Sequence, residues 1–397
     1  MSFIVATGME CSAPVIAGGL RRDELRLTGH WDRVEEDLDL VVALGISHLR
    51  YGIPFHVVAA DPNELDWAWT DRAMAAIRER PVEPIVDLVH FGVPDDLTGF
   101  GDPRLPARFV AYATAFAERY PWVRWYTPVN EPLITALGSA KRGWWNERQA
   151  DDRSFVRALD NVTTCAVEGM RIIRERRPDA IFLQSEACEA FAPADPTNPP
   201  HVAHAAHLNE LRFVAFDLTY GRPVGPAMAA WLRSNGFGRD QLDWFEANGS
   251  DAGAIVGLDY YPGNERLVDA EQETPTPERR GFAAVAREYQ ERYGLPIMLA
   301  ETNTTDDKAV AWFTELWNDT ARLFDDGVPI IGFCWYSLTD QVDWDTCLRE
   351  PNGTVNPLGL VDLDRRHRTL AGPYEAVARA ILRDGRPSMI EPRNDAT

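Results

Sequence analysis

Two glutamates stand where acid–base and nucleophilic chemistry would need them. Glu131 follows the apolar run Val123–Val129 and one asparagine, and Glu301 directly follows the run Pro296–Ala300. Cleavage of a glycosidic bond uses such a pair, because one carboxyl group protonates the leaving oxygen while the other, ionised, attacks the anomeric carbon. A separation of about 5–5.5 Å gives retention of configuration and about 6.5–9.5 Å gives inversion. We expect the two environments to push the two pKa values apart.

Further polar and aromatic residues end other apolar runs of the chain. Arg50 lies near the end of one run, and a guanidinium favours the ionised form of a carboxyl group beside it. The other polar ends are Glu10, His90, Asn130, Glu186 and Asp259. Flat rings suit the apolar faces of sugars, and aromatic residues gather at these ends: Phe91, Tyr126, Trp144, Trp145, Tyr260, Tyr261, Trp335, Tyr336 and Trp344.

The elements that must position these residues alternate regularly along the chain. Strand-like runs are followed by segments with apolar residues at helical spacing, such as Asp32–Leu44, Ala107–Tyr120 and Val202–Leu218. The pattern predicts an α/β fold, a single-domain (β/α)8 TIM barrel over residues 1–385 with a C-terminal extension at 386–397. Eight such runs are present: Phe3–Gly8, Ile46–Ile53, Glu83–Val89, Val123–Val129, Ala180–Ser185, Ile255–Tyr261, Pro296–Ala300 and Ile330–Trp335.

Composition excludes some classes of function. The net charge is −21, from 40 basic and 61 acidic residues, so binding to nucleic-acid phosphates is disfavoured. Five scattered cysteines and no C-x-x-C pair argue against a disulfide framework and a thiolate zinc site, and favour a reducing cytoplasm. No signal peptide and no membrane-spanning segment are expected, and no metal or organic cofactor is implied.

Several short motifs resemble one enzyme family. The string Thr127-Pro-Val-Asn-Glu-Pro132 is similar to the T-x-N-E-P motif of glycoside hydrolase family 1, a family of (β/α)8 glycosidases that includes β-glucosidases. Four further stretches resemble that family's strand motifs in the same order, namely Leu49–Tyr51, Glu83–Phe91, Gly257–Tyr261 and Gly332–Trp344, and Gly359–Asp364 resembles the segment before its last helix. The similarity extends from about Ala6 to Arg379.

This resemblance implies a retaining β-glycosidase that acts on small β-glycosides or oligosaccharides. Glu131 would be the general acid/base and Glu301 the nucleophile, with Arg50 and Tyr261 in contact with the nucleophile. Asn130 would bind the 2-hydroxyl of the sugar. The remaining substrate-binding residues expected are Glu10, His90, Trp335, Asp343 and Trp344.

The chain also departs from the family pattern, and the departures lie on the sugar-binding side. The nucleophile stands in Ala300-Glu-Thr-Asn303 rather than T-E-N-G, and the family's Glu before the strand-eight Trp is replaced by Asp343. Phe91, Asp259 and Glu10 replace Trp, Asn and Gln. Two alternatives therefore stay open: a transglycosidase or an enzyme for a modified sugar, and a catalytically weak sugar-binding barrel. The sequence leaves the oligomeric state unknown.

Three histidines and two glutamates allow more than one interpretation. His201, His204 and His207 have helical spacing that could suit a metal, but Pro199-Pro200 precedes them, so a solvated face at a helix start is favoured. Glu186 and Glu189 lie near a strand end, where a substrate-binding role and a structural role are equally supported.

Overall fold

The computed structural model describes residues 2–390. Eight parallel strands close into a barrel in which each strand pairs with its neighbours along the chain, and the last pairs with the first. The strands are β1 (Ile4–Met9), β4 (His48–Gly52), β5 (Glu83–Asp87), β6 (Trp125–Thr127), β7 (Ile181–Ala187), β9 (Ala254–Asp259), β12 (Ile297–Glu301) and β13 (Ile330–Trp335). The predicted (β/α)8 barrel is therefore confirmed, with a strand at each of the eight runs.

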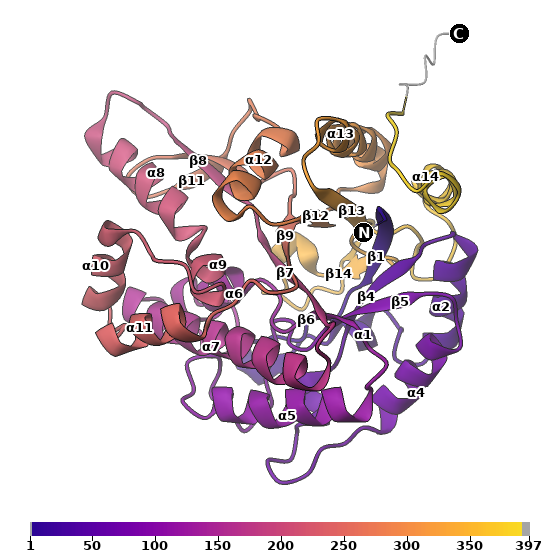
Figure 1. The fold of residues 1–397 in the computed structure, drawn as a ribbon, viewed down its shortest axis with the longest axis horizontal. Helices are drawn as coiled ribbons and strands as arrows, with labels where there is room; N and C mark the ends of the chain where they lie inside the picture. Colours follow the sequence, from indigo (N-terminus) through magenta and orange to yellow (C-terminus); the bar gives the residue numbers. More distant parts are fainter. Residues whose placement is uncertain (1, 391–397) are drawn as a thin grey trace.

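Helices surround this barrel on its outside (Figure 1). The principal ones are α2 (Val34–Ala43), α4 (Ala68–Arg78), α5 (Leu105–Arg119), α7 (Asp152–Arg176), α11 (Arg239–Asn248), α12 (Phe282–Tyr293), α13 (Asp306–Asp325) and α14 (Ala371–Asp384). Helix α14 ends with Gly385 in the left-handed conformation, a common helix stop, and it packs beside β1. Within residues 2–390, no helix is long and apolar enough to cross a membrane.

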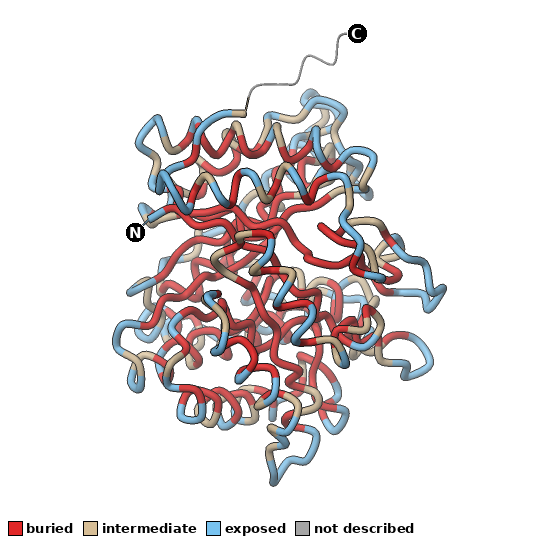
Figure 2. Tube along the Cα trace, turned by 90° about the vertical axis from the view of Figure 1, so that its right-hand side faces the viewer, coloured by how far each residue is buried: buried red, intermediate tan, exposed pale blue. Residues whose placement is uncertain are grey.

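The two faces of each strand build two separate cores. Residues that point inward form a small cluster inside the barrel that includes Ile4, Ile85, Leu183, Ile255 and Met298. Residues on the outward face pack against the helices in a much larger cluster, and Figure 2 shows buried chain running through the centre of the molecule beneath exposed loops. Because side chains alternate with a period of two, a residue's position along a strand decides which core it joins.

The prediction of one helix over Val202–Leu218 is wrong in detail. It forms two helices, α8 (Pro199–Leu211) and α9 (Val214–Thr219). The chain breaks at Arg212, whose guanidinium binds the Glu189 carbonyl at 2.5 Å and the Glu288 carboxylate at 2.5 Å. Both partners are distant in sequence, so helical periodicity could not reveal the break.

Elements absent from the predicted pattern lie between β7 and α12. Helix α10 (Pro226–Ser234) begins with proline, which suits a first helical turn. A small sheet of β8 (Ala190–Pro193), β10 (Glu265–Val268) and β11 (Glu273–Pro275) lies in the same part of the chain.

The predicted C-terminal extension is described only in part. Residues 386–390 lie against α13, where the Asn318 side chain exchanges hydrogen bonds with the backbone of Ile390 and the Trp317 indole donates to the Ser388 carbonyl at 2.8 Å. Residues 391–397 lie outside the described residues.

Candidate active site

Glu131 begins the short helix α6 (Pro132–Ala136) in a strained backbone conformation. Its φ of 41° and ψ of 65° are left-handed, a region that costs a residue with a side chain about 1–2 kcal/mol. The Glu131 N–H donates to the Ser185 carbonyl of β7 at 3.0 Å, and Pro132 fixes the first helical φ. Strained residues held by such contacts cluster at functional sites, where the backbone orients a side chain.

Glu186 holds the beginning of the same helix. One of its carboxylate oxygens accepts from the Leu133 N–H at 2.7 Å, and the other accepts from the Ala187 N–H at 3.1 Å. The first N–H groups of a helix lack partners within the helix, so a buried acceptor there is stabilising. Glu186 therefore has a structural role, which decides between the two interpretations left open by the sequence.

Glu301 is held by contacts to both of its carboxylate oxygens. One oxygen pairs with Arg50 Nη1, and the other accepts from the Tyr261 hydroxyl at 2.8 Å. The pairing of β12 with β9 shifts register between Leu299 and Glu301. Such an irregularity re-aims a side chain; here Ala300 faces the barrel interior and Glu301 still reaches Arg50.

Arg50 is the cation at the centre of this arrangement, and it is fully buried. Its Nη1 also donates to the Ala300 carbonyl at 3.2 Å, and its Nη2 donates to Asn130 Oδ1 at 2.7 Å and to Asp87 Oδ2 at 2.9 Å. A single side chain thus ties together residues from β4, β5, β12 and the end of β6. The structure brings Arg50, Asn130, Tyr261 and Glu301 together as the sequence predicted.

His90 is joined to this group through Asn130 and Asp87. Asn130 Nδ2 lies 3.2 Å from His90 Nε2, and His90 Nδ1 lies 3.3 Å from Asp87 Oδ2. Because Arg50 occupies Asn130 Oδ1, the amide presents N–H to the ring. Neutral His90 must then accept at Nε2 and carry its proton on Nδ1, where it donates to Asp87.

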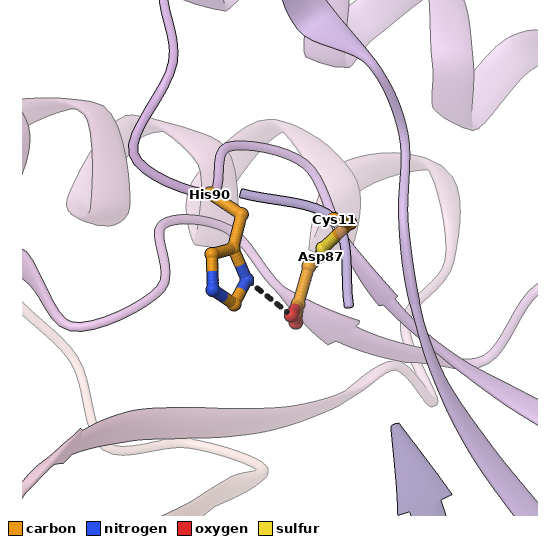
Figure 3. Close-up of side chains that lie close together, drawn as sticks. All are labelled: Cys11, Asp87 and His90. Carbon is orange, nitrogen blue, oxygen red and sulfur yellow. Dashed lines mark hydrogen bonds and ion pairs between the residues drawn. The ribbon is translucent and has the colours of Figure 1, made fainter. Parts of the chain in front are cut away.

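Cys11, Asp87 and His90 form the one close group of possible metal ligands within residues 2–390 (Figure 3). A metal on His90 Nδ1 would require the proton on Nε2, against the N–H of Asn130. It would also lie beside the Arg50 guanidinium, which already binds Asp87. We therefore interpret the group as a hydrogen bond from His90 to Asp87 with Cys11 beside it, rather than as a metal site.

The environment of Glu131 favours its protonated form. Its side chain is 8% exposed and that of Glu301 is 5% exposed. Burial raises the pKa of Glu131 well above its usual range, and the nearby carboxyl groups of Asp259, Glu301 and Glu186 raise it further. Glu301, by contrast, contacts a guanidinium and a hydroxyl donor. The two carboxyl groups thus have the unequal environments that an acid and a nucleophile need.

Glu10 lies at the opposite side of the site, after β1. Its Oε1 accepts from the Ser12 N–H at 2.9 Å. Burial raises the pKa of Glu10; His90 and Ser12 act to lower it, and Glu301 adds a smaller raising effect. Glu10 is thus a buried carboxyl group close enough to His90 and Glu301 to be affected by their charges.

Trp335 does not face the site, so the prediction that it binds substrate is wrong. Cys334 belongs to the inner cluster and Trp335 to the outer one, where its indole donates to the Leu358 carbonyl at 2.9 Å. With a period of two, the next residue turns inward. Tyr336 stacks on His90 with ring centroids 5.9 Å apart and lies 5.4 Å from the Arg50 guanidinium carbon. Gly8 makes this possible, because a Cβ there would lie 2.0 Å from the Tyr336 ring.

Asp343 lies near the site but its carboxylate is already engaged. One oxygen pairs with Arg22 at 2.5 Å and the other accepts from the Thr354 N–H at 2.7 Å, and the side chain is fully buried. A hydrogen bond from Asp343 to a sugar, as the resemblance implied, would have to replace one of these contacts. Trp344 is half-buried and packs with Phe91 and Trp145 in a small aromatic cluster.

Asp87 is a site residue to which the sequence analysis assigned no role, and Tyr336 was expected only as one of the aromatic residues at the ends of the apolar runs. Asp87 is 1% exposed and contacts both Arg50 and His90. A signal existed, because Asp87 stands two residues after Ile85 in a run that must face the barrel interior, where an acid needs a partner. For Tyr336 the signal was the alternation that placed Trp335 outside.

Glu189 and two of the three histidines lie elsewhere, around a pocket of about 390 Å³. His204 contacts the Asp269 carbonyl at 2.7 Å, and the His207 ring meets Trp231 with centroids 4.9 Å apart. Glu189 pairs with Arg266 at 3.4 Å. The helical face expected for the histidines is present on α8, and it borders this pocket.

The comparisons with known proteins agree with this geometry. The family model described as glycosyl hydrolase family 1 matches residues 27–222. Over these residues, just under half of its length, the chain is similar to glycosyl hydrolase family 1. Two curated relatives, beta-glucosidase 4 of Oryza sativa subsp. japonica and beta-glucosidase 42 of Arabidopsis thaliana, are each 29% identical over 118 residues. Those matches cover 27% of this chain and span only about a quarter, 24%, of each relative.

Solved structures of this family share the whole fold. The family 1 β-glucosidase of Thermotoga maritima superposes with a TM-score of 0.81 and 15% identity, over 95% of this chain and 97% of that one. The same protein in complex with glucoimidazole gives a TM-score of 0.80 at 16% identity, with the same coverage. At such low identity the likeness establishes the fold alone, and the predicted resemblance to the family is confirmed by the family model over residues 27–222.

Proposed function

We propose that the protein is a retaining β-glycosidase that hydrolyses small β-glycosides, with Glu131 as acid/base and Glu301 as nucleophile. The observation that carries this proposal is the contrast between the two carboxyl groups. Glu301 has one oxygen on Arg50 and the other on the Tyr261 hydroxyl, whereas Glu131 is buried among other carboxyl groups. Relatives named β-glucosidases support a β-linked sugar as substrate.

In the first step, a carboxylate oxygen of Glu301 attacks the anomeric carbon. The bond from that carbon to the leaving oxygen breaks, and the proton of Glu131 goes to the leaving oxygen. Arg50 and Tyr261 hold Glu301 in one orientation, so little rearrangement is needed before attack. Asn130, fixed by Arg50, is positioned to bind a hydroxyl of the sugar.

In the second step, the ionised Glu131 takes a proton from water as the water oxygen attacks the anomeric carbon. The bond between Glu301 and the sugar breaks, and Glu301 regains its charge beside Arg50. Two inversions at one carbon leave the configuration unchanged.

The proposal is tested with a panel of aryl β-glucosides, β-galactosides and β-fucosides. We expect hydrolysis by the wild type, and a loss of at least about a thousandfold in Glu301→Ala, because the nucleophile acts only in the transition state. Proton NMR should show the β-anomer of the product first. Equal rates for wild type and Glu301→Ala, or the α-anomer first, would exclude the two-step scheme.

A second candidate, an enzyme for a modified sugar or for transglycosylation, is favoured by one observation. Asp343 is engaged by Arg22 and Thr354, so the wall expected to bind the far edge of the sugar differs from the family pattern. The same panel with an added acceptor alcohol distinguishes these activities, since a transglycosidase forms the alkyl glycoside. Binding of glycosides by calorimetry without turnover would instead indicate a sugar-binding barrel.

A further inference from the structure

Asp87 is a buried acid that the two-step mechanism does not use. It lies at the end of β5, is 1% exposed, and its Oδ2 accepts from both Arg50 Nη2 at 2.9 Å and His90 Nδ1 at 3.3 Å. Its Oδ1 is buried without a hydrogen-bond partner among the described residues. Burial acts to raise the pKa of Asp87, but Arg50 and His90 outweigh burial and hold it below its usual value. Asp87 is therefore an ionised carboxylate beneath the site.

Asp87 and Glu301 share the positive charge of Arg50. Nη1 of the guanidinium faces Glu301 and Nη2 faces Asp87, so neither carboxylate has the cation to itself. Among the described residues, Arg50 is the one permanent cation around Glu301. The other titratable groups there come from several strands: Glu10 after β1, His90 after β5, Glu131 after β6, Asp259 on β9, Tyr261 after β9, Cys334 on β13 and Tyr336 after β13.

We propose that Asp87 is a positioning residue that divides Arg50 between itself and the nucleophile and fixes the proton of His90 on Nδ1. The proposal rests on the function proposed above, in which Glu301 is the nucleophile. It assigns Asp87 two effects on groups that meet the sugar. A nucleophile held less tightly by its cation attacks more readily. A ring with a fixed tautomer keeps Nε2 as the acceptor for the Asn130 N–H, and so orients the amide expected to bind the sugar.

The second effect follows from a closed chain of hydrogen bonds. Arg50 orients the Asn130 amide, Asn130 presents its N–H to His90 Nε2, and His90 returns its Nδ1 proton to Asp87, which contacts Arg50 again. Reversing the direction of any one bond would set two donors against each other. Asp87 supplies the one acceptor that both Arg50 and His90 use.

The substitution Asp87→Asn removes the negative charge of the side chain and keeps its shape. Its amide oxygen can take the place of Oδ2 and accept from both Arg50 and His90, while its NH₂ takes the place of the unpartnered Oδ1. Only the charge is then lost, and Arg50 stabilises the ionised form of Glu301 alone. We expect the acid limb of kcat/KM against pH to move to lower pH by about one unit, with kcat at the plateau reduced several-fold.

Asp37 offers a matched control, because it repeats the same arrangement away from the site. It is fully buried, pairs with Arg365, and accepts from His30 Nδ1 at 2.7 Å. Asp37→Asn should lower the melting temperature and leave the pH profile in place. A profile of Asp87→Asn that coincides with the wild type, or that moves to higher pH, would overturn the sharing of Arg50.

The tautomer is measured without any activity. In ¹⁵N-histidine NMR of the wild type, with the His90 signals assigned by their loss in His90→Gln, Nδ1 should keep its proton at every pH while Nε2 loses one. Asp87→Ala should weaken this preference, because only the Asn130 N–H then favours it. An Nδ1 without a proton in the neutral wild-type ring would refute the positioning role, whether or not the protein hydrolyses glycosides. A lack of hydrolysis would instead count against the proposed function.

Discussion

At the scale of single residues, the site is a set of carboxyl groups whose properties are decided by their immediate partners. Glu301 meets Arg50 and Tyr261, Glu131 meets other acids, and Asp343 is neutralised by Arg22. Similar side chains thus differ in charge state and in hydrogen-bond partners. Burial penalises every charge that lacks a partner, so each partner decides which carboxyl groups remain ionised.

One prediction at this scale concerns the alkaline side of the activity profile. Glu131 must be protonated for the first step, so activity falls as pH rises through its pKa. Asp259 is the leading neighbouring charge that raises this pKa. Asp259→Asn removes that charge, so the pKa of Glu131 falls and the base limb of kcat/KM should move to lower pH by up to about one unit.

The control for this prediction is a buried aspartate that contacts no catalytic residue. Asp217 binds Arg292 at 2.5 Å and the Tyr293 hydroxyl at 2.9 Å on the outside of the barrel, so Asp217→Asn should leave the base limb unchanged. A base limb that stays in place in Asp259→Asn would show that Asp259 carries no charge beside Glu131 in the working range.

At the scale of elements, two local irregularities orient Glu131 and Glu301. The left-handed backbone at Glu131 turns the chain from β6 into α6, and the register shift in β12 lets Glu301 face the barrel interior. The helix that follows Glu131 is only five residues long and cannot hold itself in place. It depends on Glu186, which accepts the Leu133 N–H from the adjacent strand.

Glu186→Ala should therefore weaken both stability and catalysis. The substitution leaves the Leu133 N–H buried without an acceptor, at a cost of about 1–3 kcal/mol in the free energy of unfolding. Since α6 carries Glu131, we also expect kcat to fall at least tenfold. Denaturant unfolding and steady-state kinetics on the same preparation measure both effects.

Asp151 provides the comparison, because it caps α7 by accepting from the Ser154 N–H at 2.8 Å. Asp151→Ala should lose about 0.5–2 kcal/mol of stability and keep the wild-type kcat. If Glu186→Ala behaved in the same way, the role of Glu186 in positioning Glu131 would be wrong.

At the scale of the whole molecule, the excess of acid is distributed between core and surface. The net charge is −21, and burial raises the pKa values of several internal carboxyl groups, among them Glu10, Glu24, Glu131, Glu186 and Asp259. A carboxyl group with a raised pKa in the folded state binds its proton there more tightly than in the unfolded chain. Such a group stabilises the fold at low pH, and this contribution is lost as pH rises through its folded-state pKa.

The melting temperature should consequently be highest in mild acid and fall towards pH 9. Surface repulsion among the excess acids acts in the same direction, so added salt should recover part of the loss at high pH. Below about pH 4 stability should fall again, because Asp37 and Asp87, whose pKa values are lowered, then lose their ion pairs with arginine. Calorimetry across this range checks the curve, and a steady rise from pH 5 to pH 9 would contradict it.

The amino-acid sequence by itself determined the eight strand–helix units, the family and the strand ends at which Glu131 and Glu301 stand. These features depend on short-range periodicity and on motifs of a few residues, which are legible along the chain. The expectation of one helix over Val202–Leu218 was wrong because the break between α8 and α9 depends on contacts with residues distant in sequence. The expectation for Trp335 was wrong although strand alternation, a short-range signal, indicates its outward direction.

Only the tertiary structure decided which groups meet inside the barrel. Closure of the eight strands brings Arg50 of β4 between Asp87 of β5 and Glu301 of β12, residues separated by up to 251 positions. It also places Arg22 on Asp343, so that a sugar would have to displace an existing partner of that carboxylate. Charge pairing in a buried site depends on distances through space, and spacing along the sequence carries no record of them.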